Sequence, residues 1–315
     1  MNYPKRLWTW LLAAVFGVVC GPAWAQEEPA AAEPAVKVVA AAPAKAAGEK
    51  TPFRRLAPGV MVSIDPAPQE SETFSRHDIN EVLAGGRKLP WAKDVAFRHD
   101  VFNLQFSFKP VRMMQVDIPQ TNGQMQRELI WYMVYSITNA GKTMHPVADA
   151  DGTYKIESVD QKTQFIPKFY LEGYRTRDDM EKKKGGMVFD ERVLPVAVAQ
   201  IRQREDPARR FLNTGEMCRE IAVGDTVWGI VTFEKVNLNI RWFSIYVQGL
   251  TNAYQWVDDP SQFQDPNQVW VGKGRRMSLK TLKLNFWRPA DEVNPHEEEI
   301  RFGMPGGVDY EWVYR

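Results

Sequence analysis

Alternation of large apolar and polar residues constrains the fold of this 315-residue chain more than any other feature. In the clearest run, 101–108, every second residue is large and apolar, namely Phe102, Leu104, Phe106 and Phe108. A period of two places all four on one face of a β-strand. The run 111–118 shows the same period, and Asn122-Gly123 after it is a strong signal for a hairpin turn.

Three further runs predict strands with different surroundings. The run 129–138 (LIWYMVYSIT) is apolar at both parities, which indicates a central strand covered on both faces. In 241–250, Trp242, Ser244 and Tyr246 lie opposite the apolar series that begins at Phe243. In 277–287, Leu282, Leu284 and Phe286 alternate with polar residues such as Lys283 and Asn285, so one face of that strand is expected to be wet.

Many such runs separated by Gly, Pro, Asn and Asp are typical of antiparallel all-β domains. We therefore predict a mostly β protein, an antiparallel immunoglobulin-like β-sandwich with one or two short helices. A faint echo between 135–140 and 246–253, where an aromatic strand runs into Thr-Asn, leaves open two packed sandwiches; repeated turn chemistry explains the echo equally well. One helix is expected at 195–204, with a strand as the alternative, and the charged stretch 175–186 is expected to be a loop.

The first 25 residues have the pattern of a secretory signal peptide. Lys5 and Arg6 precede an apolar run, 7–20, and Ala23-Trp24-Ala25 is the small-x-small pattern that a signal peptidase cleaves. The run is short for a span of about 20 residues, so cleavage near Ala25 is favoured over an anchor. No later segment of the sequence is long and apolar enough to cross a membrane. We expect export and a periplasmic or extracellular location.

Composition divides the remainder into a spacer and a body. Residues 26–52 are rich in Ala, Pro, Glu and Lys and predict a disordered spacer. Residues 53–315 form the β-rich body, with 53–190 and 191–315 as its alternative sub-halves. With 40 basic against 39 acidic residues, the chain lacks the positive charge typical of nucleic-acid binding, so no nucleic-acid partner is expected.

The segments LIWYMVYSITNAG, MCREIAVGDTVWGIVTF and YVQGLTNAY resemble an uncharacterised family of exported bacterial proteins with immunoglobulin-like β-sandwich character. The resemblance covers about residues 100–315. It implies a fold and a cell-envelope location. It implies no functional residues, so none are assigned from it.

Two acidic loops are weak candidates for a calcium site. Asp149 and Asp151 stand in Asp-Ala-Asp-Gly, which is similar to the start of a calcium loop but lacks its later ligands. Asp258, Asp259 and Asp265 lie in a second loop with two prolines. Both patterns are also typical of solvated turns, so no metal and no cofactor is predicted.

The second acidic loop is also the best sequence candidate for a ligand site. Trp256 and Trp270 flank Asp258 and Asp259, and exposed aromatic rings can stack on sugars. The alternative for each Trp is core packing. We single out no catalytic residue: Cys218 lacks a nucleophile signature and is expected to be a small buried side chain, and no G-x-S-x-G or P-loop is present.

These observations favour an exported, non-enzymatic binding or structural protein of the cell envelope, with a protein or glycan partner. The first alternative is a carbohydrate-binding module, with calcium as an optional aid. The second is a hydrolase built on a β-sandwich scaffold.

Overall fold

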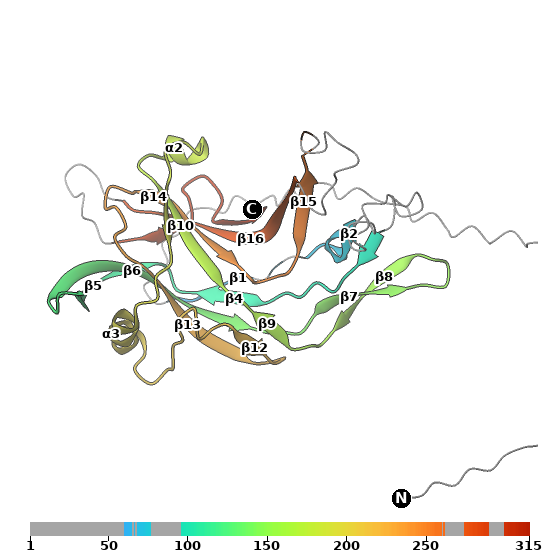
Figure 1. Cartoon of the computed structure of the whole chain (residues 1–315), viewed down its shortest axis with the longest axis horizontal. Helices are drawn as coiled ribbons and strands as arrows, with labels where there is room; N and C mark the ends of the chain where they lie inside the picture. The colour runs from blue at the N-terminus through green and yellow to red at the C-terminus, as the bar shows by residue number, and fades with distance from the viewer. Residues whose placement is uncertain are drawn as a thin grey trace, which may run out of the picture. The chain divides into compact units, whose positions relative to one another are not determined.

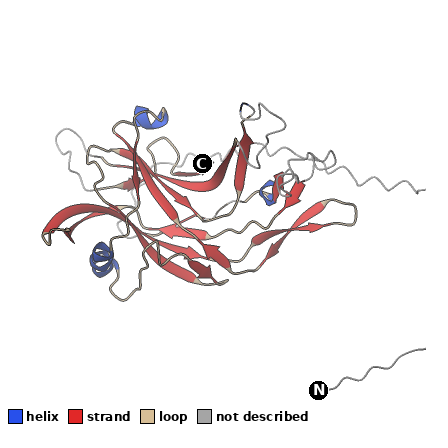
Figure 2. Ribbon diagram, viewed as in Figure 1, coloured by secondary structure: helices blue, strands red, loops and turns tan. Residues whose placement is uncertain are grey.

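The computed structural model describes residues 60–64, 66, 68–76, 96–259, 261, 274–289 and 299–315. The predicted signal peptide and spacer lie outside these residues, as do Asp265 and Trp270. The described part is mostly β, and its sheets are antiparallel, as predicted (Figure 2). None of its helices is both long enough and apolar enough to span a bilayer.

Five strands form the first large sheet. They are β1 (Val62–Ile64), β4 (Gln105–Phe108), β5 (Arg112–Pro119), β6 (Met125–Thr138) and β13 (Thr226–Phe233). Strand β6 is the longest of them; it pairs with β13, and it also pairs with β4 and β5 at different parts of its length. Gly123 has φ 78° in the turn between β5 and β6, which confirms the hairpin predicted at Asn122-Gly123.

Seven strands form the second large sheet. They are β10 (Lys168–Tyr174), β11 (Met187–Asp190), β14 (Trp242–Gln248), β15 (Tyr254–Asp258), β16 (Arg275–Trp287), β17 (Arg301–Phe302) and β18 (Tyr310–Tyr314). Strand β16 pairs with four other strands of this sheet. Each large sheet takes strands from both sides of residue 190, so the two parts of the body are interleaved.

The remaining strands form three two-stranded sheets. They are β2 (Phe74–Arg76) with β3 (Ala96–Arg98), β7 (Thr143–Ala148) with β8 (Tyr154–Val159), and β9 (Thr163–Phe165) with β12 (Arg219–Ile221). The β7–β8 hairpin extends away from the large sheets (Figure 1).

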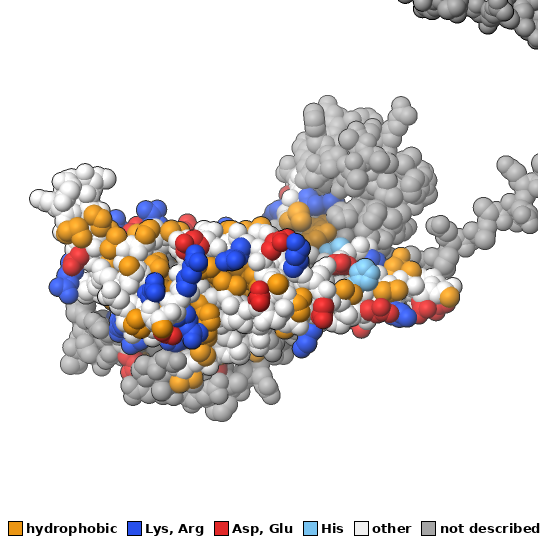
Figure 3. Space-filling view, turned by 90° about the horizontal axis from the view of Figure 1, so that it is seen from below, with side chains coloured by type: hydrophobic (Ala, Val, Ile, Leu, Met, Phe, Trp, Pro, Cys, Tyr) orange, Lys and Arg blue, Asp and Glu red, His pale blue; other side chains and the backbone are white. Residues whose placement is uncertain are grey.

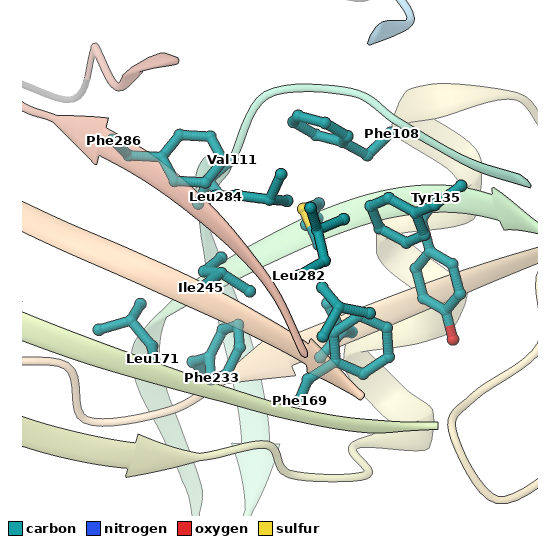
Figure 4. Close-up of a cluster of buried hydrophobic side chains, with 14 of the residues drawn as sticks. Phe108, Val111, Tyr135, Phe169, Leu171, Phe233, Ile245, Leu282, Leu284 and Phe286 are labelled. Carbon is teal, nitrogen blue, oxygen red and sulfur yellow. The ribbon is translucent and has the colours of Figure 1, made fainter. Parts of the chain in front are cut away.

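Side chains of both large sheets meet in one aromatic core. Alternate residues of β6 point into it: Trp131 lies 5.2 Å, centroid to centroid, from Phe243 of the other sheet, and Tyr135 lies 4.9 Å from Phe169. Phe108 contacts Phe286 in the same way. These side chains are almost completely shielded from solvent and belong to one cluster (Figure 4).

The opposite face of β6 is also buried, as its two apolar parities predict. Ile130, Tyr132 and Val134 pack against Ala197 and Ile201 of helix α3 (Pro195–Glu205), which lies beside the five-stranded sheet (Figure 1). The helix predicted here is confirmed, and the strand alternative is wrong. Pro at its first turn and Arg202 and Arg204 in its last turn are the signals that predicted it.

One expected loop contains a short helix. Within 175–186, α2 (Arg177–Glu181) begins at Thr176, whose hydroxyl accepts a hydrogen bond from the Asp179 N–H. The pairs Arg177–Glu181 and Lys182–Asp178 stabilise it at i,i+4 spacing. A capping threonine three residues before an acid was the overlooked signal.

A buried ion pair joins the start of the described chain to its end. Glu72, in the 3-10 helix η1 (Glu70–Thr73), accepts from Lys280 of β16 at 2.5 Å, and both side chains are about 5% exposed. Glu72 also accepts from the Tyr314 hydroxyl of β18 at 2.8 Å. Because these groups are shielded from water, the contacts hold η1 against β16 and β18 of the seven-stranded sheet.

We predict that Glu72→Gln lowers the free energy of unfolding by about 3 kcal/mol, because it removes the carboxylate charge that neutralises Lys280 in a buried site. Denaturant unfolding measures the change. The matched control is Glu220→Gln, which removes the exposed pair with Lys162 and should cost less than about 0.5 kcal/mol. Equal costs for the two variants would contradict the role of Glu72.

The core also predicts the effect of a single methyl group at Gly229. A Cβ at this position of β13 would lie 2.5 Å from Cζ of Tyr135, whose ring is held in the core. We expect Gly229→Ala to cost about 2 kcal/mol in the same assay, since overpacking forces neighbouring atoms to move. Gly215→Ala, where a Cβ would meet only the Asn213 side chain, at 3.2 Å, should stay within about 0.5 kcal/mol.

Candidate functional site

The outer face of the seven-stranded sheet carries a row of aromatic and charged side chains. The strand register places Tyr170 of β10 opposite Tyr246 of β14, Tyr246 opposite Lys283 of β16, and Lys283 opposite Glu311 of β18. Their chain neighbours, such as Leu171 and Ile245, point the other way into the core. The row is therefore a direct consequence of the alternation that builds the sandwich.

A second row supports the first. Glu172 of β10 lies opposite Ser244, and Ser244 lies opposite Asn285. The Ser244 hydroxyl donates to Asn285 Oδ1 at 2.8 Å, and Asn285 Nδ2 donates to the Val308 carbonyl. The polar face predicted for 277–287 is present, but the expectation that it is wet is wrong at its centre, because Asn285 and Ser244 are each about 1% exposed and hydrogen-bond within the protein.

Tyr170 and Tyr246 are stacked, with ring centroids 4.6 Å apart and planes 7° from parallel. The guanidinium of Arg315 lies over both rings, 4.5 Å from the Tyr246 centroid. Arg315 also donates to Glu172 at 2.6 Å, and Lys283 is paired with Glu311. Two ion pairs and two stacked rings thereby form one connected cluster.

A hollow of about 490 Å³ opens over this cluster. Its wall includes Glu172, Lys183, Tyr246, Lys283, Glu311 and Arg315. Lys183 comes from the segment that follows α2 and makes no ion pair within the described part of the chain. The hollow therefore has one more positive than negative side chain on its described wall, and an aromatic ring at its base.

The ion pair between Glu172 and Arg315 keeps its charges over a wide pH range. Burial pushes the pKa of Glu172 upward, but hydrogen bonds from Arg315, Tyr246 and Tyr174 outweigh it, and the pKa lies below its usual value. The hydrogen bond to Glu172 holds the pKa of Arg315 above its usual value. Burial, with the nearby Glu172, raises the pKa of Tyr174 to about 12 and that of Tyr246 further. Such groups are suited to hold a ligand by fixed charges and donors rather than to exchange protons near neutral pH.

The ligand site expected from sequence lies elsewhere, on β15. Trp256 is half-buried, and the Arg275 guanidinium lies 3.9 Å from its ring centroid, which covers one face of the indole. Asp258 pairs with Arg275 through the backbone register, and its side chain lies outside the described residues. Asp259 accepts hydrogen bonds from the Ser261 N–H and hydroxyl. The described contacts of Asp259 are thus those of a turn.

The other weak metal candidates also make turn contacts. Asp151 accepts from the Thr153 N–H and hydroxyl, and Asp149 accepts from the Ala150 N–H, at the tip of the β7–β8 hairpin. Over the residues that the structure describes, no three His, Cys, Asp or Glu side chains gather as a metal site would require.

A third group of residues contains a carboxyl that titrates near neutrality. Burial raises the pKa of Glu191 to about 7, although a hydrogen bond from the Thr214 hydroxyl at 2.9 Å opposes the shift. Glu191 interacts electrostatically with Tyr135, whose buried hydroxyl makes no hydrogen bond within the described residues and points out of the core (Figure 4). Cys218, which also interacts with Tyr135, is exposed rather than buried; the expectation from sequence is wrong because the Cys follows a surface turn.

The surface shown in Figure 3 mixes basic, acidic and hydrophobic side chains. Comparisons with known proteins found no matching family model, no matching curated protein and no matching solved structure. The function must therefore be argued from the geometry of the hollow.

We predict that Glu191→Gln stabilises the protein at pH 8 and has little effect at pH 4. In the unfolded chain the carboxyl ionises near its ordinary pKa of 4.5, whereas the folded state holds its proton up to about pH 7. Folding stability is therefore lost as pH rises between these values, and the neutral amide avoids that loss. We expect a gain of about 1–2 kcal/mol at pH 8 after allowance for solvent screening.

Denaturant unfolding of both proteins at the two pH values measures this difference. Glu216→Gln is the control, because Glu216 is exposed and lies in the same surface turn. A gain for Glu191→Gln that is equal at both pH values would contradict the raised pKa.

Proposed function

We propose that this chain is an exported, non-enzymatic binding protein of the bacterial cell envelope. On this proposal the body is an immunoglobulin-like sandwich, and its ligand lies in the hollow on the outer face of the seven-stranded sheet. Two antiparallel sheets around one core support the proposed sandwich fold. The signal-peptide pattern of residues 1–25 supports export.

The observation that carries the proposal is the combination of shape and fixed charge in the hollow. Tyr246 offers a ring and a hydroxyl that keeps its proton, and Glu172 and Arg315 hold each other in place. Lys183 and Lys283 add cationic donors at the wall. Preorganised, paired polar groups in a hollow are suited to a polar ligand that forms several hydrogen bonds.

A glycan is the ligand class that these features favour. The carbohydrate-binding alternative is therefore kept, but its site is placed in the hollow instead of at Trp256 and Asp259. Sugar rings present an apolar face to an aromatic ring and hydroxyl groups to planar polar side chains. The hollow supplies the polar side chains for such hydroxyl groups, namely Glu172, Lys183 and Lys283. The Tyr246 ring itself contacts Tyr170 and Arg315, as Trp256 on β15 contacts Arg275, so the hydroxyl contacts are the feature that favours a glycan.

A glycan array and sedimentation with isolated cell envelopes test the proposal on the mature protein. We expect binding that is weakened at least about tenfold in Tyr246→Ala and in Lys183→Ala, since each removes a group of the hollow. Lys183 is the sharper variant, because it makes no described ion pair whose loss could unfold the protein.

Trp256→Ala is the matched control, an aromatic residue of the same sheet outside the hollow. Loss of binding in Trp256→Ala with retention in Tyr246→Ala and Lys183→Ala would move the site to β15. Turnover of ester, peptide or glycoside substrates that a single substitution abolishes would overturn the non-enzymatic proposal.

A further inference from the structure

A second hollow, of about 260 Å³, lies outside the seven-stranded sheet. Its described wall comes from η1 and β2 on one side and from β3 and β8 on the other. The side chains that matter are Glu70, Ser71, Thr73, Phe74, Arg98 and Tyr154. No residue of this wall belongs to the hollow described above.

Arg98 is held between two aromatic rings. Its guanidinium carbon lies 4.2 Å from the ring centroid of Phe74, the residue opposite it in the β2–β3 pair, and 4.8 Å from that of Tyr154. Rings that contact a guanidinium in this way fix the plane of the group and leave its N–H edge available. That edge makes no hydrogen bond or ion pair with any described residue.

Two other stacked arginines of this protein have a carboxylate partner. Arg209 lies 4.0 Å from the Trp228 ring and pairs with Asp206, and Arg315 lies over Tyr246 and pairs with Glu172. Arg98 has no such partner among the described residues, and Glu72 of η1, which does not line the hollow, contacts Lys280 and Tyr314.

The surroundings of Arg98 destabilise its positive charge. Partial burial lowers the pKa of Arg98, since desolvation disfavours the cation and no carboxylate of the described chain compensates it. A half-buried cation that has no counter-ion among the described residues, at the wall of a hollow, favours the binding of an external anion.

We infer that the hollow at Arg98 is a binding site for the oxyanion of a small molecule, a carboxylate or a phosphate. The guanidinium edge donates two parallel hydrogen bonds to the anion, the geometry for which arginine is best suited. The Ser71 hydroxyl at the wall is a further donor, and the rings of Phe74 and Tyr154 contact the apolar part of the ligand.

Glu70 limits the affinity of this site. Its carboxylate lies on the same wall and makes no described ion pair, so it repels an incoming anion. Neutralising Glu70 should therefore strengthen binding, whereas neutralising Arg98 should abolish it. Opposite changes in anion affinity in the two variants distinguish binding at this site from a general effect of the net charge of the protein.

Isothermal titration of the mature protein with inorganic phosphate, acetate and benzoate tests the inference, with chloride held constant to fix screening. We expect saturable binding of at least one probe, a loss of at least about tenfold in Arg98→Gln, and tighter binding in Glu70→Gln. Arg98→Lys keeps the charge but not the fork, so it should bind more weakly than the parent.

Arg209→Gln is the matched control, since it removes a stacked guanidinium that already has a counter-ion, and Lys183→Ala separates this site from the sheet hollow. Both should bind the probe as the parent does. Absence of saturable binding to all three probes, or equal affinity in Arg98→Gln and the parent, overturns the inference. If circular dichroism shows that Arg98→Gln is unfolded, parent-like affinity of Arg98→Lys for acetate together with no gain in Glu70→Gln overturns it.

Discussion

Burial of both faces of β6 is the constraint on which the rest of the structure depends. Trp131 and Tyr135 contact the opposing sheet, while Ile130 and Tyr132 contact the layer that contains α3. A slip of one residue would exchange the two sets, because side chains alternate along a strand. Such a slip would be energetically costly for two reasons. It would remove the large rings of Trp131 and Tyr135 from the core, and it would break the hydrogen bond that the Tyr132 hydroxyl donates to Glu205 at the end of α3.

The same anchor explains how α3 is held in place. Glu205 is almost completely buried and is contacted by Lys109, Arg112 and the Tyr132 hydroxyl. Although burial raises the pKa of Glu205, hydrogen bonds from Lys109 and Tyr132 outweigh it and the pKa lies below its usual value. The carboxylate therefore stays charged and ties the helix to β5 and β6 at one point, while Ala197 and Ile201 supply the apolar contact.

Local patterns predicted the strands, because the alternation of apolar and polar residues can be recognised within a single segment of sequence. The centre of β6, the polar face of β16 and the helix at 195–205 all follow from spacing within one segment. The short helix α2 was missed although its cap is equally local. Pairing is different: Tyr170, Tyr246, Lys283 and Arg315 meet only through the register of four strands, and no segment of sequence contains that register. The hollow could not be predicted for this reason, and the aromatic-acidic loop at Trp256 was chosen in its place because its residues are adjacent in sequence.

The sequence echo between 135–140 and 246–253 acquires a physical meaning from the structure. Asn139 Nδ2 donates to the carbonyls of Gln161 and Ile221, and Asn252 Nδ2 donates to the Asp100 carbonyl while its Oδ1 accepts from the Phe102 N–H. Each asparagine thus follows an aromatic strand and joins backbone segments distant in the chain, one beside each large sheet. An amide offers two N–H donors and an acceptor oxygen on one short side chain, which suits each asparagine to this joining role.

Core and candidate site depend on one register in the seven-stranded sheet. On the core face, Phe169 lies opposite Val247 and Leu171 lies opposite Ile245. The pair between these two, Tyr170 opposite Tyr246, must therefore lie on the other face of the sheet. The apolar contacts that fix the first two pairs therefore also position the stacked rings and, through Glu172, the Arg315 guanidinium. The charged side chains that line the sheet hollow are therefore paired, apart from Lys183, whereas Arg98 lies on a two-stranded sheet and lacks a described counter-ion. On the two proposals made above, the first hollow would recognise shape and hydrogen-bonding groups and the second would recognise charge, so the two would bind different parts of a ligand or different ligands.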